Sequence, residues 1–128
     1  MMQKFAPSLR WFALLMLCAA YLQGGVVKLA DYAGAQAEMA YFGLPHWFAA
    51  GVIALELGAS GLILTGIGRW IGAIALAGFT LLATLLALRF WELPVGSERF
   101  MAANAFFEHI GLAGGFVLVA LHDFGSRK

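Results

Sequence analysis

The sequence predicts an all-α integral membrane four-helix bundle, with the N-terminus and C-terminus both cytoplasmic. Three observations predict it: an apolar composition, four apolar runs of spanning length, and a bias of basic residues toward one side. Of the 128 residues, 62% are hydrophobic and 12% are charged. Soluble domains carry about 25% charged residues. A chain with so little charge is expected to lie in lipid rather than water.

Each apolar run is long enough, or nearly so, to cross a bilayer. A helix needs about 20 residues to span a hydrocarbon core of about 30 Å. We treat residues 1–128 as one membrane domain with spans at about 9–30, 46–68, 69–90 and 104–121. The first three runs meet the required length and the fourth lies close to its lower limit. Helices are expected because open strands cannot satisfy their backbone in lipid.

The breaks between the runs support this division. The first run could be mistaken for a secretory signal, but it stays apolar to Val27, which is too long for such a segment, so we expect a retained span. A polar loop from Asp31 to Pro45 precedes the second run. Only "GIGRW" separates the second and third runs, which predicts a tight hairpin. A segment with Pro94 and several charges, Trp91 to Ala103, precedes the fourth run.

Basic residues near the span ends predict the orientation. Cytoplasmic loops carry an excess of Lys and Arg. With the N-terminus inside, the inner side carries Lys4, Arg10, Arg69, Arg127 and Lys128, and the outer side carries Lys28, Arg89 and Arg99. Trp11, Trp47, Trp70 and Trp91 all fall at predicted span ends, where tryptophan anchors helices in the interface.

A few polar residues fall inside the predicted spans and form the candidate site. Glu56 lies near mid-membrane, within "GVIALELGASGLIL". Asn104 and Glu108 are four residues apart and therefore share a helical face. We predict a polar pocket opening to the outer side, with Glu56 below the other members. The ligand-binding candidates are Lys28, Glu56, Asn104, Glu108, His109 and Arg99; no catalytic residue is assigned.

Each candidate has a structural alternative. A charge at the bilayer centre costs about 2.5–3.5 kcal/mol on insertion scales, so Glu56 is expected to face protein or water, or to be protonated. An Asn, Ser or Lys partner that only fixes helix packing would satisfy this requirement. Lys28 is near a span end and can extend to the headgroups. Glu108 and His109 lie close enough to the interface to be solvated.

Several chemistries are disfavoured by the residues present. Cys18 is the only cysteine, which rules out an intramolecular dithiol relay. His46 and His109 are the only outer-side pair for a haem, and we do not favour it. We see no metal cluster, phosphate-binding loop or nucleophile–base triad. The net charge of +1 gives no indication of nucleic-acid binding.

Several segments, in order, resemble the DoxX-like family of membrane proteins. They are "GGVVKLADY" from Gly24, "YFGLP" ending at Pro45, "ELGASGLILTGIGRW" from Glu56, and "NAFFEHIGLAGG" from Asn104. The similarity extends from about Arg10 to Leu121, whereas the C-terminal "HDFGSRK" departs from the family pattern.

The resemblance implies a multi-pass protein of the bacterial inner membrane that is associated with redox metabolism. Family members are linked to quinone-dependent oxidases and related systems. We therefore expect a quinone-binding or accessory/anchor subunit of a membrane redox complex, with no covalently bound cofactor and quinone as the ligand. Expected partners are the lipid bilayer, other membrane subunits or further copies of the chain. The alternative is a small proton-coupled transporter that uses a membrane-embedded carboxylate.

Overall fold

The computed structural model describes residues 2–126 of the chain and contains only helices in that range. Their bounds are α1 Met2–Ala30, α2 Tyr32–Tyr41, α3 Phe48–Thr65, α4 Arg69–Ala87, the short 3-10 helix η1 Phe90–Glu92, and α5 Ser97–Ser126. Four of these helices are long and apolar enough to cross a membrane. Arg127 and Lys128, and the side chain of Lys4, which entered the orientation argument, lie outside the described residues.

The structure adds one helix to the predicted segments, and several helix ends differ from the predicted span ends. The segment expected to be a polar loop, Asp31 to Pro45, contains helix α2. The Asp31 side chain accepts a hydrogen bond from the Gly34 backbone N–H at 3.1 Å, which is the geometry of an N-cap. Helix α5 begins at Ser97 rather than near Asn104. The first turns of α5 carry polar residues. The predicted start was later because hydropathy detects only the apolar part of a helix.

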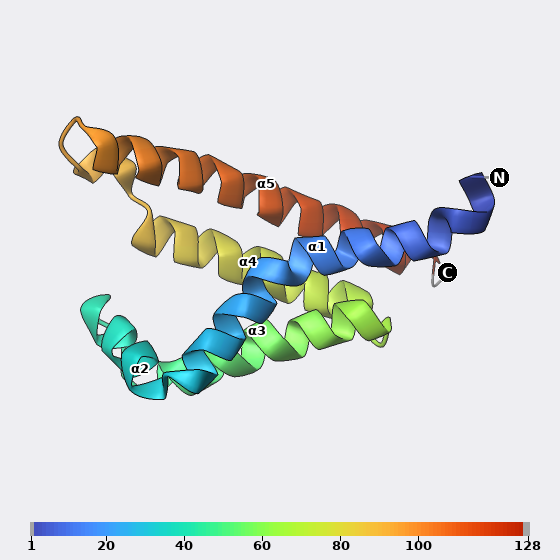
Figure 1. Ribbon diagram of the computed structural model, residues 1–128, viewed down its shortest axis with the longest axis horizontal. Coiled ribbons are helices and arrows are strands. Elements are labelled where there is room, and N and C mark those ends of the chain that lie inside the picture. The colour runs from blue at the N-terminus through green and yellow to red at the C-terminus, as the bar shows by residue number, and fades with distance from the viewer. Residues whose placement is uncertain (1, 127–128) are drawn as a thin grey trace.

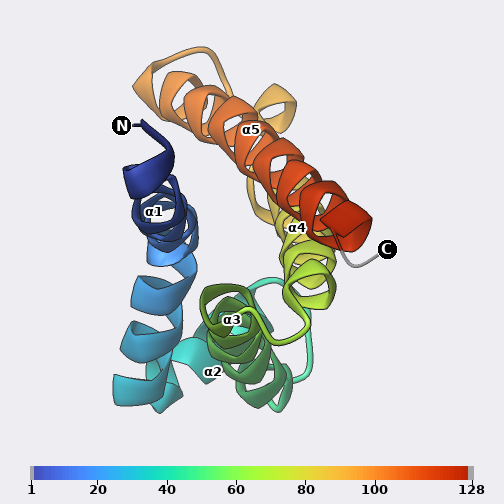
Figure 2. The same cartoon turned by 90° about the vertical axis from the view of Figure 1, so that its right-hand side faces the viewer.

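The long helices form two pairs that share a core at one end (Figure 1). Helix α1 packs on α3 and α4 packs on α5, while α3 also packs on α4 and so joins the pairs. The start of α1 and the end of α5 lie at the same end of the bundle, which we call the terminal end. At the opposite end, which we call the α2 end, the ribbon of α2 lies apart from the start of α5 in both views (Figure 2).

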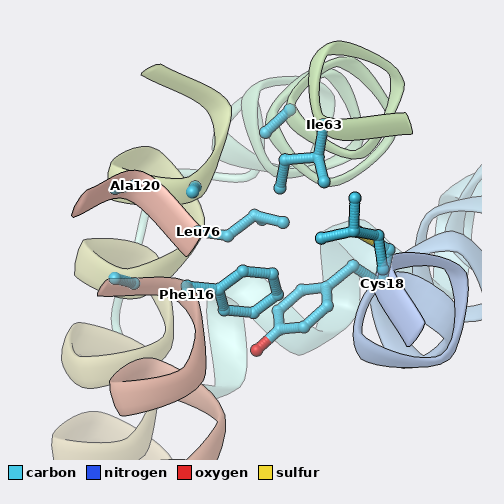
Figure 3. Packing of buried hydrophobic residues seen from close by; sticks show 10 residues of the cluster. Cys18, Ile63, Leu76, Phe116 and Ala120 are labelled. Carbon is cyan, nitrogen blue, oxygen red and sulfur yellow. The ribbon is translucent and has the colours of Figure 1, made fainter. Parts of the chain in front are cut away.

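The main apolar core lies in the terminal half of the bundle. Leu76 and Phe116 are fully buried and point toward Cys18 and Ile63, so that all four long helices contribute (Figure 3). A Cβ at Gly72 would lie 2.6 Å from the Ala59 carbonyl oxygen. This glycine therefore permits the close approach of α3 and α4.

Side chains bonded to backbone groups tie the terminal end together. The Trp11 indole N–H donates to the Leu64 carbonyl at 3.0 Å, and Arg69 Nε donates to the Ile63 carbonyl at 2.7 Å. The Trp70 backbone N–H donates to Asp123 Oδ2 at 3.1 Å. Because the first N–H groups of a helix have no partner inside it, Asp123 caps the start of α4 from α5.

The α2 end has a smaller core of its own. Ala35 and Met39 of α2 are buried against Ala49 of α3. Beside them, an open groove of about 460 Å³ separates α2 from the end of α4 and η1. Its lining residues are Tyr41, Phe42, Leu86, Ala87, Arg89, Glu92 and Leu93. The two helix pairs are thus joined by packing at one end and separated by a groove at the other.

Candidate functional site

The central feature of the site is an ion pair between α1 and α3. Lys28, in the last turn of α1, donates a hydrogen bond to Glu56 Oε1 at 3.0 Å. Glu56 lies midway along α3 and is only 5% exposed. Carboxylates are almost never this buried unless they are paired, so the lysine explains how an acid is retained at this depth.

Gly24 makes room for the carboxylate. It lies one turn before Lys28, so both residues are on the same face of α1. A Cβ at Gly24 would lie 3.0 Å from Glu56 Oε2 and 3.4 Å from Lys28 Nζ. In the sequence "GGVVK", the glycine that makes room for the acid thus lies one helical turn before the lysine that pairs with it. This arrangement provides the lysine partner that the structural alternative for Glu56 requires.

The pair retains hydrogen-bonding capacity. An ammonium group has three N–H donors, and Glu56 accepts one of them. Among the described residues no other acceptor for Lys28 Nζ and no donor to Glu56 Oε2 is found within hydrogen-bonding geometry. The Lys28 side chain is 19% exposed, compared with 6% for that of Glu56. A ligand at the α2 end would therefore reach the lysine before the acid.

Further polar groups continue from this pair into the bundle. Tyr21, one turn before Gly24 on α1, shares a short hydrogen bond between its hydroxyl and that of Thr80 on α4. Tyr21 also lies close enough to Glu56 for electrostatic interaction. One turn earlier on α1, the Cys18 thiol lies beside the Ser60 hydroxyl of α3. Two bonded polar pairs, Lys28–Glu56 and Tyr21–Thr80, thus lie two turns apart along α1.

The remaining candidates all lie on α5, and the structure does not link them to this pair. Among residues 2–126, no hydrogen bond or ion pair joins Asn104, Glu108, His109 or Arg99 to Lys28 or Glu56. Asn104 and Glu108 are exposed. All four lie in the first half of α5, which belongs to the other helix pair.

His109 is the α5 candidate with a fixed orientation. Its Nδ1 lies 2.6 Å from the Ala105 carbonyl oxygen. A carbonyl oxygen can only accept, so Nδ1 carries the proton, and Nε2 of the neutral ring is then an acceptor. His109 shares a helical face with the buried residues Ala113 and Phe116, four and seven positions later. The ring therefore lies on the side of α5 that contributes to the core.

Sequence reasoning missed four polar residues that the structure buries. They are Ser60, Thr80, Thr84 and Asp123. Hydroxyls hardly alter the hydropathy of an apolar run, so Ser60, Thr80 and Thr84 give a weak signal. Spacing could have helped, because Ser60 follows Glu56 by one turn and Thr84 follows Thr80 by one turn. Among the described residues, no group of three or more His, Cys, Asp or Glu side chains could hold a metal ion.

Comparison with known proteins identifies the family of the chain. Residues 10–89 match the DoxX family. The chain is 33% identical over 106 residues to the inner membrane protein YqjF of Escherichia coli K12, covering 83% of this chain and 77% of that protein. No solved structure matches the chain significantly. With its four apolar helices, the chain is a multi-pass inner-membrane protein and belongs to the DoxX family.

Proposed function

We propose that this protein is a quinone-binding or accessory component of a membrane redox complex, with the ligand held in the α2 half of the bundle. The observation that carries the proposal is the Lys28–Glu56 pair, a partly exposed cation on a buried acid inside a membrane bundle. Ionisable residues in membrane segments are costly and generally mark ligand or ion sites.

Quinone chemistry matches the capacity of this pair. A quinone ring has two carbonyl oxygens that accept hydrogen bonds, and the N–H groups of Lys28 not used by Glu56 can donate to one of them. A quinone reduced by two electrons takes up two protons and becomes a hydroquinone, whose hydroxyls can donate to Glu56 Oε2 or to His109 Nε2. In this proposal the chain binds the ring and exchanges protons, and a partner subunit transfers the electrons.

The arrangement also suits the hydrophobic part of a quinone. The groove between α2 and the end of α4 is lined by leucine, phenylalanine and alanine as well as by charged residues. An isoprenoid tail needs an apolar surface that is continuous with lipid. A groove between two separated helix pairs provides such a surface.

Native mass spectrometry of the full chain, gently extracted from its membranes, tests the proposal. We expect one added mass of a quinone per chain. Glu56→Gln and Lys28→Met should each weaken binding at least about tenfold, because a hydrogen bond to a charged group contributes about 1.5–3 kcal/mol. Glu98→Gln, at an exposed acid in the first turn of α5, is the matched control.

Two results would overturn the quinone assignment. If Glu56→Gln and His109→Ala bind quinone as the wild type does, the polar groups are not its site. If further polypeptides co-purify without any quinone, the chain is an accessory anchor. Proton-coupled uptake by vesicles that contain the chain alone would instead support a transporter based on Glu56.

The proposal includes an orientation. With both termini cytoplasmic, the α2 end and the Lys28–Glu56 pair face the opposite side, as the distribution of basic residues favours. Labelling of single cysteines with a membrane-impermeant maleimide tests this in a Cys18→Ala background. A cysteine at Val95, which is 91% exposed, should react in intact spheroplasts, and one at Gly125 should react only after lysis. The reverse pattern would contradict the orientation.

A further inference from the structure

The segment that follows α4 presents a cation and an anion to the groove at the α2 end. Arg89 precedes η1, Glu92 ends it, and both residues line the groove. Arg89 Nη1 lies 3.5 Å from Glu92 Oε2, whereas a charge-assisted hydrogen bond measures about 2.7–2.9 Å. The two side chains are 47% and 54% exposed. The pair is therefore loose, and each group is free to bind a ligand group of opposite charge.

Aromatic rings hold this segment against α5. Phe90 and Trp91, which lie between the two charged residues, contact the Phe106 ring edge-to-face, with centroid distances of 5.4 and 5.7 Å. The Glu92 backbone N–H donates to the Arg89 carbonyl at 3.0 Å and closes the turn. The rings thus fix the backbone of the segment on α5, while its two charged side chains line the groove.

The groove lies where an apolar span ends. The span that includes α4 extends to Glu92, and Trp91 is 49% exposed. Tryptophan is enriched at the level of the lipid headgroups. From the groove, the surface of α4 continues through Leu86 and, one turn earlier, through Leu82, which is 72% exposed. A ligand can therefore place a polar head beside the charges and an alkyl chain along these leucines.

The size and charge of the groove indicate the kind of headgroup that fits. Its volume of about 460 Å³ falls within the range of small-molecule sites, about 300–1,000 Å³. Of the described residues that line it, one is a cation, one is an anion and the others are aromatic or aliphatic. An anionic headgroup would be attracted by Arg89 and repelled by Glu92. A headgroup that carries both charges satisfies both residues.

We propose that the groove binds one phospholipid with an ethanolamine headgroup, with its phosphate on Arg89 and its ammonium on Glu92. A guanidinium binds phosphate oxygens through parallel N–H bonds. A carboxylate accepts hydrogen bonds from a primary ammonium, whereas the quaternary ammonium of choline has no N–H to donate. The glycerol and the upper acyl chains lie against the apolar wall that Phe42, Leu86 and Leu93 form.

The lipid site does not depend on the quinone assignment, although the two ligands would share one surface. The proposed function places an isoprenoid tail against the same apolar wall. If that function holds, the phospholipid occupies the groove until a quinone tail displaces it. The ethanolamine-lipid content of the membrane then sets the apparent affinity for quinone, a consequence that rests on the proposed function.

Native mass spectrometry of the full-length protein tests the site without added quinone. The protein, delipidated in detergent, is mixed with equal amounts of dioleoyl-phosphatidylethanolamine, dioleoyl-phosphatidylglycerol and dioleoyl-phosphatidylcholine. We expect one retained lipid per chain, with the ethanolamine lipid preferred about fivefold over each of the others, as for a favourable charge pair that is partly exposed.

Variants assign the two charges. Glu92→Gln should abolish the preference for ethanolamine over choline, because the ammonium loses its charged partner. Arg89→Gln should weaken retention of all three lipids about fivefold, because each carries a phosphate. Glu98→Gln and Arg10→Gln are the matched controls, since both residues are exposed and neither lines the groove.

The outcomes are distinct from those of the quinone experiment. Equal retention of the three lipids by the wild type, preferential retention of phosphatidylglycerol, or a preference that persists in Glu92→Gln would overturn the ethanolamine site. Quinone binding by a chain without lipid preference would overturn the lipid site alone. Selective retention of the ethanolamine lipid by a chain that binds no quinone would support the site and remove only the competition.

Discussion

At the terminal end, Trp11, Arg69 and Asp123 bond to backbone groups of a neighbouring helix or turn, whereas at the α2 end the α1–α3 pair is held by a bond between two side chains. Backbone groups are fixed in position, so the bonds at the terminal end define how the helices sit. The Lys28–Glu56 pair joins flexible side chains. A ligand that supplies its own hydrogen-bonding partner can compete for such a pair.

The apolar packing is also more extensive at the terminal end than at the α2 end. The main core lies toward the terminal end and includes residues from four helices, whereas the core at the α2 end is limited to α2 and α3. We infer that packing and backbone-directed bonds fix the helix arrangement at the terminal end, whereas the α2 end depends on one ion pair and is available for binding. The predictions below test this difference, from the largest expected effect to the smallest.

The Lys28→Met variant should cause the largest loss in the free energy of unfolding. It leaves the Glu56 carboxylate buried without a counter-ion, and breaking a buried pair from one side costs about 3 kcal/mol. Unfolding in mixed detergent and SDS micelles measures this loss. The double variant Lys28→Met/Glu56→Gln should regain most of it. Equal losses in the single and double variants would show that the two residues do not act as a pair.

The Gly72→Ala variant should cause the next largest loss of stability, because it forces α3 and α4 apart at the terminal end. The new Cβ would lie 2.6 Å from the Ala59 carbonyl oxygen, and backbone cannot yield as a side chain can. Overpacking of this kind costs about 1–3 kcal/mol. Gly78→Ala on the same helix is the control, since nothing lies within 4 Å of its added Cβ. The same unfolding measurement should show no loss for Gly78→Ala; equal losses would contradict the close approach.

The Asp123→Ala variant should cost about 1 kcal/mol, the usual effect of removing a helix cap. It leaves the Trp70 backbone N–H without the carboxylate of α5. Hydrogen exchange at the start of α4 should become faster, while exchange in α2 is unchanged. Asp123→Asn keeps an acceptor oxygen and should lose less than Asp123→Ala. Faster exchange throughout the bundle would show that Asp123 does more than cap one helix.

The smallest effect is expected for Thr84→Val, at less than about 1 kcal/mol, because the hydroxyl that it removes has no protein partner. Tyr21→Phe is the comparison, since it breaks a bond and strands the Thr80 hydroxyl, and should cost more. Both losses can be read from the same SDS titration. A larger loss for Thr84→Val than for Tyr21→Phe would indicate a strong bond at Thr84 and contradict its lack of a protein partner.

The position of each polar residue along its helix was predictable, and the contacts of individual side chains were only partly so. Glu56 was placed within a span and Lys28 near a span end, and both are found there. Their pairing depends on how far α1 is rotated about its axis, which depth does not determine. For the same reason, sequence reasoning grouped the α5 residues with Lys28, whereas the structure bonds Lys28 to Glu56 and leaves Asn104 and Glu108 exposed.

By itself, the sequence determined a helical membrane protein with four long apolar helices, and it contained the motifs of the DoxX family. Hydropathy and length suffice for this because lipid demands an apolar surface and an internally bonded backbone along every span. Only the tertiary structure decided that Lys28 meets Glu56, that Asp123 caps α4, and that the Ser60 and Thr84 hydroxyls are enclosed in the interior. These contacts depend on the lateral arrangement and rotation of helices, which arise from the packing of many small contacts rather than from any one motif.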